Sequence, residues 1–256
     1  MRLSFAEQIQ NANVLLHENE VEKSIENYQE ALSVATTPEQ KLHLYSVLGR
    51  LYQRTKNPVL SIEAFENALG LMEWNDQLGT PIDRASILNN IAAIQSEMDK
   101  AKAIDHYKKA LSIYAEIVQN GESDYGPHLA NTQFALAEVF AKKKDYYFAK
   151  KYYKEAIKIY EGLKNPEYLK LRASAHYQLG NIYTEEFNLF DAKVHYTKAQ
   201  ILFENLIEDG DDALKPYLAA VLNNLAVTLN SMEEPQKALQ FYGMALKAYQ
   251  ELSDLN

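Results

Sequence analysis

The chain has 256 residues, 47% of them hydrophobic, and its formal net charge of −9 argues against non-specific nucleic-acid binding, which requires a basic surface. It contains no cysteine, so disulfides, thiolate catalysis and zinc–thiolate sites are excluded, and its first residues lack the apolar run of a signal peptide. The longest uninterrupted apolar stretch, Tyr217 to Leu222, is far too short to span a membrane. Together with the acidic net charge, this leads us to expect a cytoplasmic protein with no nucleic-acid or membrane partner.

A helical pattern recurs six times along the chain. In each copy a small residue is followed four positions later by an aromatic residue, and three positions after that by alanine. The closing alanines are Ala31, Ala68, Ala110, Ala156, Ala199 and Ala245, spaced 37 to 46 residues apart. Such positions fall on one stripe of an α-helix, and a unit that recurs at this period is typical of a helical solenoid.

Prolines mark the expected helix boundaries, because a helix interior does not tolerate them. One proline falls in each gap between successive copies; these are Pro38, Pro81, Pro127, Pro166 and Pro216. Pro58 and Pro235 lie instead just ahead of the pattern in copies two and six, where they indicate the turn inside the copy. The proline positions therefore predict an all-helical chain.

Each copy also contains an earlier helix with a large apolar residue, then glycine or alanine, then a large residue three positions later. LGRLY (48–52) and LGNIY (179–183) show it most clearly. Each copy then reads as two antiparallel helices joined by a short turn. This arrangement resembles the tetratricopeptide repeat, and its length is similar to the longer repeat class of kinesin light chains and bacterial scaffold proteins. The resemblance implies an all-α fold, a right-handed superhelical α-solenoid of six helix-turn-helix repeats.

We expect residues 1–256 to form a single solenoid domain. The expected repeats span approximately 5–38, 42–75, 82–118, 127–163, 168–207 and 216–252. Three departures from the family pattern are visible. Copy one has Asn11-Ala12 where Leu-Gly is usual. Ser24 and Ser61 replace the first alanine of the second helix in copies one and two, and copy three is one residue short in its turn. None of these departures changes the expected fold.

The resemblance also implies a role for polar residues on the first helices. In the longer repeat class an extended peptide lies in the concave groove, and asparagines hold its backbone through the donor and acceptor of their amides. The segments LNNIA (88–92) and LNNLA (222–226) place Asn90 and Asn224 at the matching positions, with Gln178 and Gln10 as near equivalents. The expected peptide-binding residues are Asn13, Arg50, Arg54, Asn89, Asn90, Asn131, Tyr177, Asn181, Asn223 and Asn224. The alternative is that the asparagines only hydrogen-bond to the adjacent helix within the stack.

Charged clusters allow two interpretations each. Arg50 and Arg54, one helical turn apart, could pair with an acidic side chain or a C-terminal carboxylate of a partner, or could be solvated. Seven lysines between Lys142 and Lys158 indicate a solvated outer face more than an acidic docking patch. The acidic residues around Gly210 lack the regular ligand spacing of a calcium loop.

The sequence contains no GxGxxG, GxxxxGK[ST], GxSxG or HExxH motif. We therefore expect a non-enzymatic scaffold with no catalytic residue, metal site or cofactor. It would bind an extended peptide segment of a protein partner, with an acidic segment as one alternative. The other class left open is a peptide-responsive regulatory receptor of the bacterial pheromone-sensor type, although the repeats begin within five residues of Met1 and leave no room for an effector domain there.

The last helix predicts a further contact. Leu239, Phe241, Leu246 and Tyr249 are expected to form an apolar strip on its outer side. Because exposed apolar strips tend to find a partner, we expect end-to-end homo-oligomers or docking of another protein through this uncapped C-terminal repeat.

Overall fold

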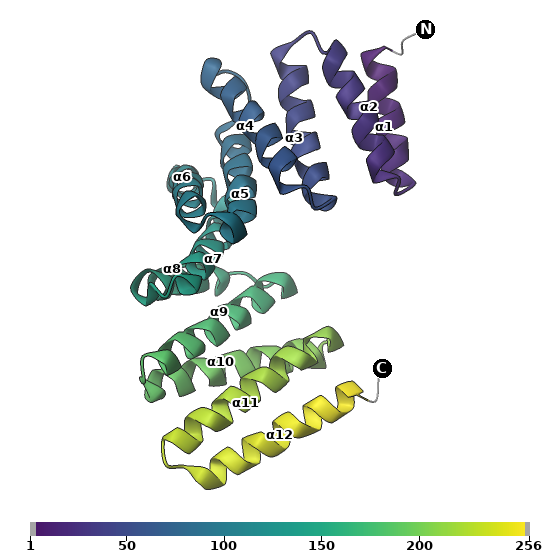
Figure 1. The fold of residues 1–256 in the computed structure, drawn as a ribbon. Helices are drawn as coiled ribbons and strands as arrows, with labels where there is room; N and C mark the ends of the chain where they lie inside the picture. The colour runs from purple at the N-terminus through teal and green to yellow at the C-terminus, as the bar shows by residue number, and fades with distance from the viewer. Residues whose placement is uncertain (1–3, 254–256) are drawn as a thin grey trace. The chain divides into compact units, whose positions relative to one another are not determined.

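The computed structural model describes residues 4–253, with side chains up to residue 250. Over this range the chain forms twelve α-helices and two short 3₁₀ helices, and no strand occurs among these residues (Figure 1). The described residues form two compact units, here called unit 1, which ends at Gly121, and unit 2, which begins at Glu122. No helix within residues 4–253 is both long enough and apolar enough to cross a membrane.

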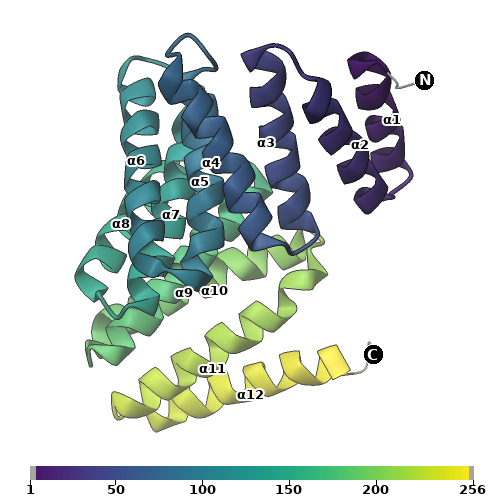
Figure 2. The same cartoon turned by 45° about the horizontal axis from the view of Figure 1, so that its top comes forward.

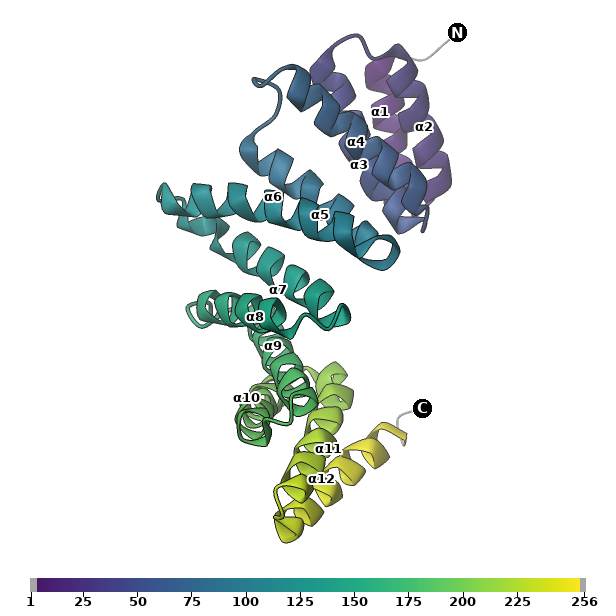
Figure 3. The same cartoon turned by 60° about the vertical axis from the view of Figure 1, so that its left-hand side comes forward.

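Unit 1 consists of three helix pairs that follow one another along the chain. Its helices are α1 (Phe5–His17), α2 (Val21–Val34), α3 (Pro38–Arg54), α4 (Pro58–Trp74), α5 (Pro81–Met98) and α6 (Lys100–Gln119). Within each pair the helices pack along their length, as Figure 2 shows for α1 with α2 and Figure 3 for α5 with α6. The first helix of each later pair packs against the second helix of the pair before it.

Unit 2 repeats this organisation. Its helices are η1 (Ser123–Tyr125), α7 (Gly126–Lys142), α8 (Tyr146–Tyr160), α9 (Pro166–Glu185), α10 (Leu189–Glu208), η2 (Asp212–Leu214), α11 (Lys215–Ser231) and α12 (Pro235–Ser253). The predicted all-α solenoid of six helix pairs is therefore confirmed. The superhelical sense and the union of all six repeats in one domain remain predictions.

The prolines lie where the sequence predicts helix ends. All seven occupy the first or second position of a helix. Thr37 caps α3 and Thr80 caps α5 through their side chains, and each forms a reciprocal capping box with the residue three positions on. Because Thr37 starts the helix, the second pair begins at Pro38 and not near residue 42 as expected.

The small residues of the pattern allow the helices of a pair to approach closely. A Cβ atom on Gly49 would come within 2.6 Å of the Phe65 ring, and one on Gly180 within 2.5 Å of the Tyr196 ring. The five closing alanines from Ala31 to Ala199 have no exposed surface, and Ala245 is 3% exposed. The recurring pattern thus describes the contact between the two helices of each repeat.

The two serines that depart from the pattern have a structural role. Both are fully buried. Ser24 Oγ donates a hydrogen bond to the Ala12 carbonyl oxygen at 2.8 Å, and Ser61 Oγ donates to the Gly49 carbonyl oxygen at 2.7 Å. Each serine therefore joins the second helix of its repeat to the first, and its hydroxyl is not left unsatisfied in the core.

Five of the six intra-repeat turns contain one residue in the left-handed region. These are Asn19, Lys56, Lys144, Phe187 and Glu233, with φ between 56 and 62°. In the third repeat Asp99 both ends α5 and caps α6, so this residue is missing. The copy that is one residue short in sequence is therefore the one with the tighter turn.

Candidate functional site

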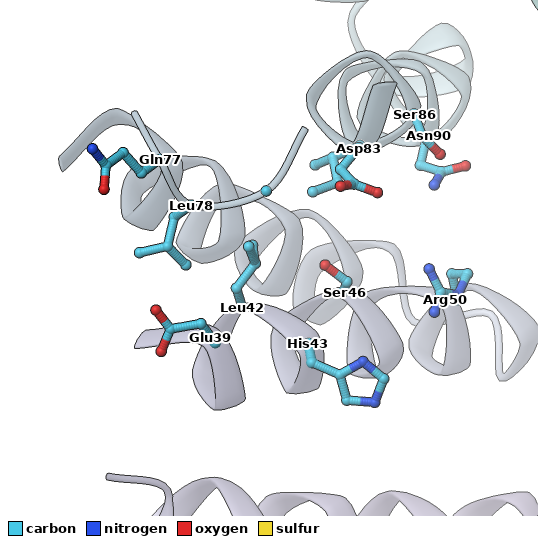
Figure 4. Close-up of a pocket in the computed structure, with 12 residues that line it drawn as sticks. Glu39, Leu42, His43, Ser46, Arg50, Gln77, Leu78, Asp83, Ser86 and Asn90 are labelled. Atoms are coloured by element: carbon cyan, nitrogen blue, oxygen red, sulfur yellow. The ribbon is translucent and has the colours of Figure 1, made fainter. Parts of the chain in front are cut away.

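A pocket of about 370 Å³ opens between α3 and α5 of unit 1 (Figure 4). Residues from α3, α5 and the loop that precedes α5 line it: Glu39, Leu42, His43, Ser46, Arg50, Gln77, Leu78, Gly79, Asp83, Ser86, Ile87 and Asn90. Leu78 and Ile87 are 3% and 4% exposed and form an apolar floor beneath polar residues. We call this surface the α3–α5 pocket.

The loop before α5 contributes to the pocket because its backbone folds back toward α3. Asn75 Oδ1 accepts a hydrogen bond from the Gln77 backbone N–H at 3.1 Å, and the Leu78 N–H donates to the Asn75 carbonyl oxygen at 3.0 Å. Gly79 follows with φ of +71°, and a Cβ there would come within 2.6 Å of the Met72 side chain. Glycine adopts this φ at the lowest cost, and a larger residue here would also have to displace the end of the Met72 side chain.

Two of the predicted binding residues lie at the same end of the α3–α5 pocket. Figure 4 shows Arg50 near Ser86 and Asn90, whereas Glu39 and Gln77 lie at the other end. Neither the Arg50 nor the Asn90 side chain forms a hydrogen bond or ion pair with another residue in the range 4–253. Their donors, together with the Asn90 carbonyl, are therefore available to a ligand.

The polar surface continues from α3 to α1. Burial raises the pKa of the Tyr28 hydroxyl, and the positive charge of the Arg50 guanidinium offsets part of this rise. The Tyr28 hydroxyl donates to Asn13 Oδ1 at 2.7 Å. Asn13 itself is exposed and lies with Gln10 on a shallow hollow of α1. Asn13, Arg50 and Asn90 thus lie on three successive first helices of unit 1.

Of the neighbouring residues that the sequence predicts to bind together, only one in each pair lines the α3–α5 pocket. Arg54 is the last residue of α3 and is exposed, but it does not line the α3–α5 pocket. Asn89 on α5 is partly buried and also lies outside the pocket lining. The pocket therefore contains Arg50 without Arg54 and Asn90 without Asn89.

In unit 2 the corresponding asparagines bond to one another. Asn181 Oδ1 accepts from the Tyr196 hydroxyl at 2.8 Å and from Asn224 Nδ2 at 3.0 Å. Asn181 Nδ2 donates to Gln178 Oε1 at 3.1 Å, and Asn224 Nδ2 also donates to the Tyr177 hydroxyl at 3.3 Å. For these residues the interpretation as hydrogen bonds within the stack fits the geometry better than a free peptide-binding surface.

The two remaining predicted asparagines of unit 2, Asn131 and Asn223, are half-buried. Asn131 Oδ1 accepts from the Tyr160 hydroxyl at 2.8 Å, and Tyr160 is fully buried. Asn223 lies beside Asn224 on α11 and forms no side-chain hydrogen bond with another described residue.

A histidine pair in unit 2 was not recognisable from the sequence, because its members lie on different helices. His176 Nδ1 and His195 Nδ1 are 2.9 Å apart, and one must donate to the other. Burial lowers the pKa of His176 to about 3 and the pKa of His195 to about 4, so both rings are neutral at pH 7. No three His, Asp or Glu side chains in the described part of the chain gather closely enough to hold a metal ion.

The sequence also did not indicate the contribution of the loop from Gln77 to Gly79. Its Gly-Thr-Pro segment predicts a helix start but not the inward path of Leu78.

A family model described as tetratricopeptide repeat matches residues 83–162 and 171–251. Three solved structures share the fold at low sequence identity. BtubC (BKLC) from P. vanneervenii is 21% identical over 98% of this chain and 93% of that one, with a TM-score of 0.70. The apo form of RapI is 18% identical over 96% of this chain and 63% of that one, with a TM-score of 0.72. The apo quorum sensor NprR from B. thuringiensis is 17% identical over 95% and 64%, with a TM-score of 0.63. No curated protein matches the sequence.

Proposed function

Because the chain belongs to the tetratricopeptide repeat family, we propose that it is a non-enzymatic scaffold that binds an extended peptide segment of a partner protein. The α3–α5 pocket is the proposed binding site. The observation that carries this proposal is the position of Arg50 and Asn90 at one end of the pocket with no hydrogen bond or ion pair to other described side chains.

The chemistry of the pocket defines the proposed ligand. An asparagine amide offers both a donor and an acceptor, which suits a peptide backbone. An arginine forms a bidentate pair with a carboxylate, so Arg50 favours an acidic side chain or a C-terminal carboxylate. The floor of Leu78 and Ile87 can accommodate an apolar side chain. We therefore propose a ligand in which an apolar residue and a carboxylate lie a few residues apart.

A fluorescent peptide library tests this proposal. The peptides are hexamers with either an internal Asp or Glu or a free C-terminal carboxylate, and their binding to the full chain is measured by anisotropy. Replacing Arg50→Glu should remove a charge-assisted hydrogen bond of ~1.5–3 kcal/mol and weaken the best binders roughly 10- to 100-fold. Binding should also weaken as salt is raised.

Arg54→Glu is the matched control. It makes the same charge change one turn further along α3, outside the pocket lining. It should leave the dissociation constant within about threefold of the wild type, because exposed long-range charges are screened. An equal loss of peptide affinity in both variants would show that only the net charge of the protein matters. Unchanged affinity in Arg50→Glu would show that the peptide does not bind in the α3–α5 pocket.

The likeness to the quorum sensor NprR supports a second candidate, a regulatory receptor for a short free peptide. Such a receptor must change conformation when it binds, whereas a scaffold need not. Donor and acceptor dyes placed on exposed positions of α2 and α12 would report a change. A shift in energy transfer on adding a binding hexamer favours the receptor, and an unchanged signal favours the scaffold.

The apolar strip on α12 supports a separate proposal about assembly. Leu239, Leu246 and Tyr249 are 73%, 59% and 47% exposed, whereas Phe241 is partly buried. Self-association through this strip remains a prediction, which a Leu246→Asp variant tests directly in sedimentation.

A further inference from the structure

Three turns of unit 2 share one backbone conformation but present different side chains. Their left-handed residues are Lys144, Phe187 and Glu233, with φ of 60, 57 and 61°. The turns join α7 to α8, α9 to α10 and α11 to α12, and they lie along the same side of unit 2 (Figure 1, left). In chain order this edge therefore presents a cation, an aromatic ring and an anion at equivalent positions. We call it the turn edge.

The central residue has no evident role within the chain. Phe187 is 88% exposed, and Phe190, three residues further on, is 69% exposed. A bulky residue in the left-handed region is disfavoured, and glycine would adopt φ of +57° at lower cost. The left-handed conformation is common to five of the six intra-repeat turns, and at this turn two exposed aromatic side chains lie at or next to the tip. Exposed apolar side chains that gather in one place are typical of a contact with a partner.

Ion pairs hold the turns to one another. Lys150 on α8 pairs with Glu186, next to Phe187, at 2.5 Å. Lys193 on α10 pairs with Glu234, next to Glu233, at 3.1 Å. These pairs are half-buried, and they tie α8 to the second turn and α10 to the third. The turn edge is therefore ordered before any partner arrives.

The charged residues at the two ends of the turn edge, Lys144 and Glu233, differ from Glu186 and Glu234 in this respect. Lys144 and Glu233 are exposed, and neither forms an ion pair with another residue of the described range. Lys143 adds a further exposed positive charge beside Lys144. The left-handed residue is thus a cation at one end of the edge and an anion at the other, with the aromatic residues between them.

This order of charges is complementary to itself. A two-fold axis through Phe187 would place Lys144 of one copy opposite Glu233 of the other, at both ends, with the two Phe187 rings between them. An anionic membrane suits the edge less well, since Glu233 and the net charge of −9 oppose it. We propose that the turn edge is the interface of a symmetric homodimer.

Sedimentation velocity of the full chain at ~1–200 µM tests the proposal, since weak dimers become populated in this range. Phe187→Gly removes the ring at a position whose φ suits glycine, so the fold is retained. It should weaken the dimer at least about tenfold, as expected for a central aromatic anchor. Peptide binding through Arg50 should remain unchanged, which keeps this test separate from the proposed function.

A charge exchange gives the sharper test. Lys144→Glu and Glu233→Lys should each weaken the dimer several-fold, because each places like charges opposite one another. The double variant should restore the wild-type dimer. Lys56→Glu is the matched control, since Lys56 is exposed and occupies the same turn position in unit 1 with φ of 56°. It should have no effect.

Several results would overturn the proposal. They are a monomer at every concentration, a dimer that is lost in Leu246→Asp but not in Phe187→Gly, and a double variant that fails to recover. Binding to vesicles of phosphatidylserine and phosphatidylcholine that is lost in Lys144→Glu and not restored in the double variant would assign the edge to a membrane surface instead.

Discussion

Asn90 in unit 1 and Asn224 in unit 2 occupy matching positions in their repeats, yet their surroundings differ. Asn224 reaches Tyr177 and Asn181 on the preceding first helix and bonds to both. On α3 the residues matching Tyr177 and Asn181, counted from the Leu-Gly pair, are Ser46 and Arg50, and they line an open pocket with Asn90. The same asparagine thus closes a network in one unit and faces a cavity in the other.

The side chain on the preceding first helix explains why Asn90 and Asn224 have different surroundings. A tyrosine is long enough to fill the space between successive first helices and to accept a hydrogen bond there. A serine is not, and the arginine beside it extends its charge to solvent. The helix geometry is common to both units, so the residue opposite the asparagine determines whether the asparagine is hydrogen-bonded within the stack or lines an open pocket.

The largest effect should come from overpacking a helix crossing, in one unit at a time. Ala199 in unit 2 and Ala68 in unit 1 are both fully buried. Ala199→Phe should cost ~1–3 kcal/mol of stability, because a ring must be forced into a filled helix crossing. Since each repeat depends on its neighbours, circular dichroism should show a broader melting curve with an earlier first step. Ala68→Phe should lower stability by a similar amount through unit 1. An unchanged melting curve in both variants would argue against the assigned contact stripe.

Acid should destabilise unit 2 through its histidine pair. Burial lowers the folded-state pKa of His176 to about 3 and of His195 to about 4, below the ordinary value of 6.5. As pH falls below 6.5 the unfolded chain takes up protons that the folded chain does not, so stability decreases toward pH 4. Melting temperatures from pH 7 to pH 5 should therefore fall. The decline should be shallower in His176→Gln, which keeps a polar group without titrating in this range, and an identical decline in both proteins would contradict the assignment.

Replacing Asn224 by alanine should lower stability more than replacing Asn90 by alanine. Asn224→Ala removes two hydrogen bonds of the network, at a net cost of ~0.5–1.5 kcal/mol each. Asn90→Ala should change stability by less than ~0.5 kcal/mol, since it removes no hydrogen bond or ion pair to a described side chain. Chemical denaturation measures both. A larger loss for Asn90→Ala than for Asn224→Ala would reverse the comparison.

The repeats could be predicted because their signals are local. Leu-Gly pairs, small-aromatic-alanine stripes and prolines each describe a contact or a boundary within one repeat, and Gly49 and Gly180 meet the aromatic rings that the pattern predicts. The short turn of copy three was also visible as one missing residue.

The lining of the proposed binding site could be predicted only in part. Arg50 and Asn90 were selected by residue type and position, but Asn181 and Asn224 were selected on the same grounds and bond to each other. Which asparagine remains available depends on side chains about a repeat length away, and no local pattern reports it. The inward path of Leu78 likewise depends on a loop conformation that Gly79 permits.

The most direct test converts the unit 1 site into its unit 2 counterpart. The double variant Ser46→Tyr, Arg50→Asn should fill the α3–α5 pocket and give Asn90 the partners that Asn224 has. Anisotropy with the best hexamer from the library should then show binding weakened at least about tenfold, with thermal stability equal to or above that of the wild type. Unchanged peptide binding in a folded double variant would contradict the account, because it would place the site outside this pocket.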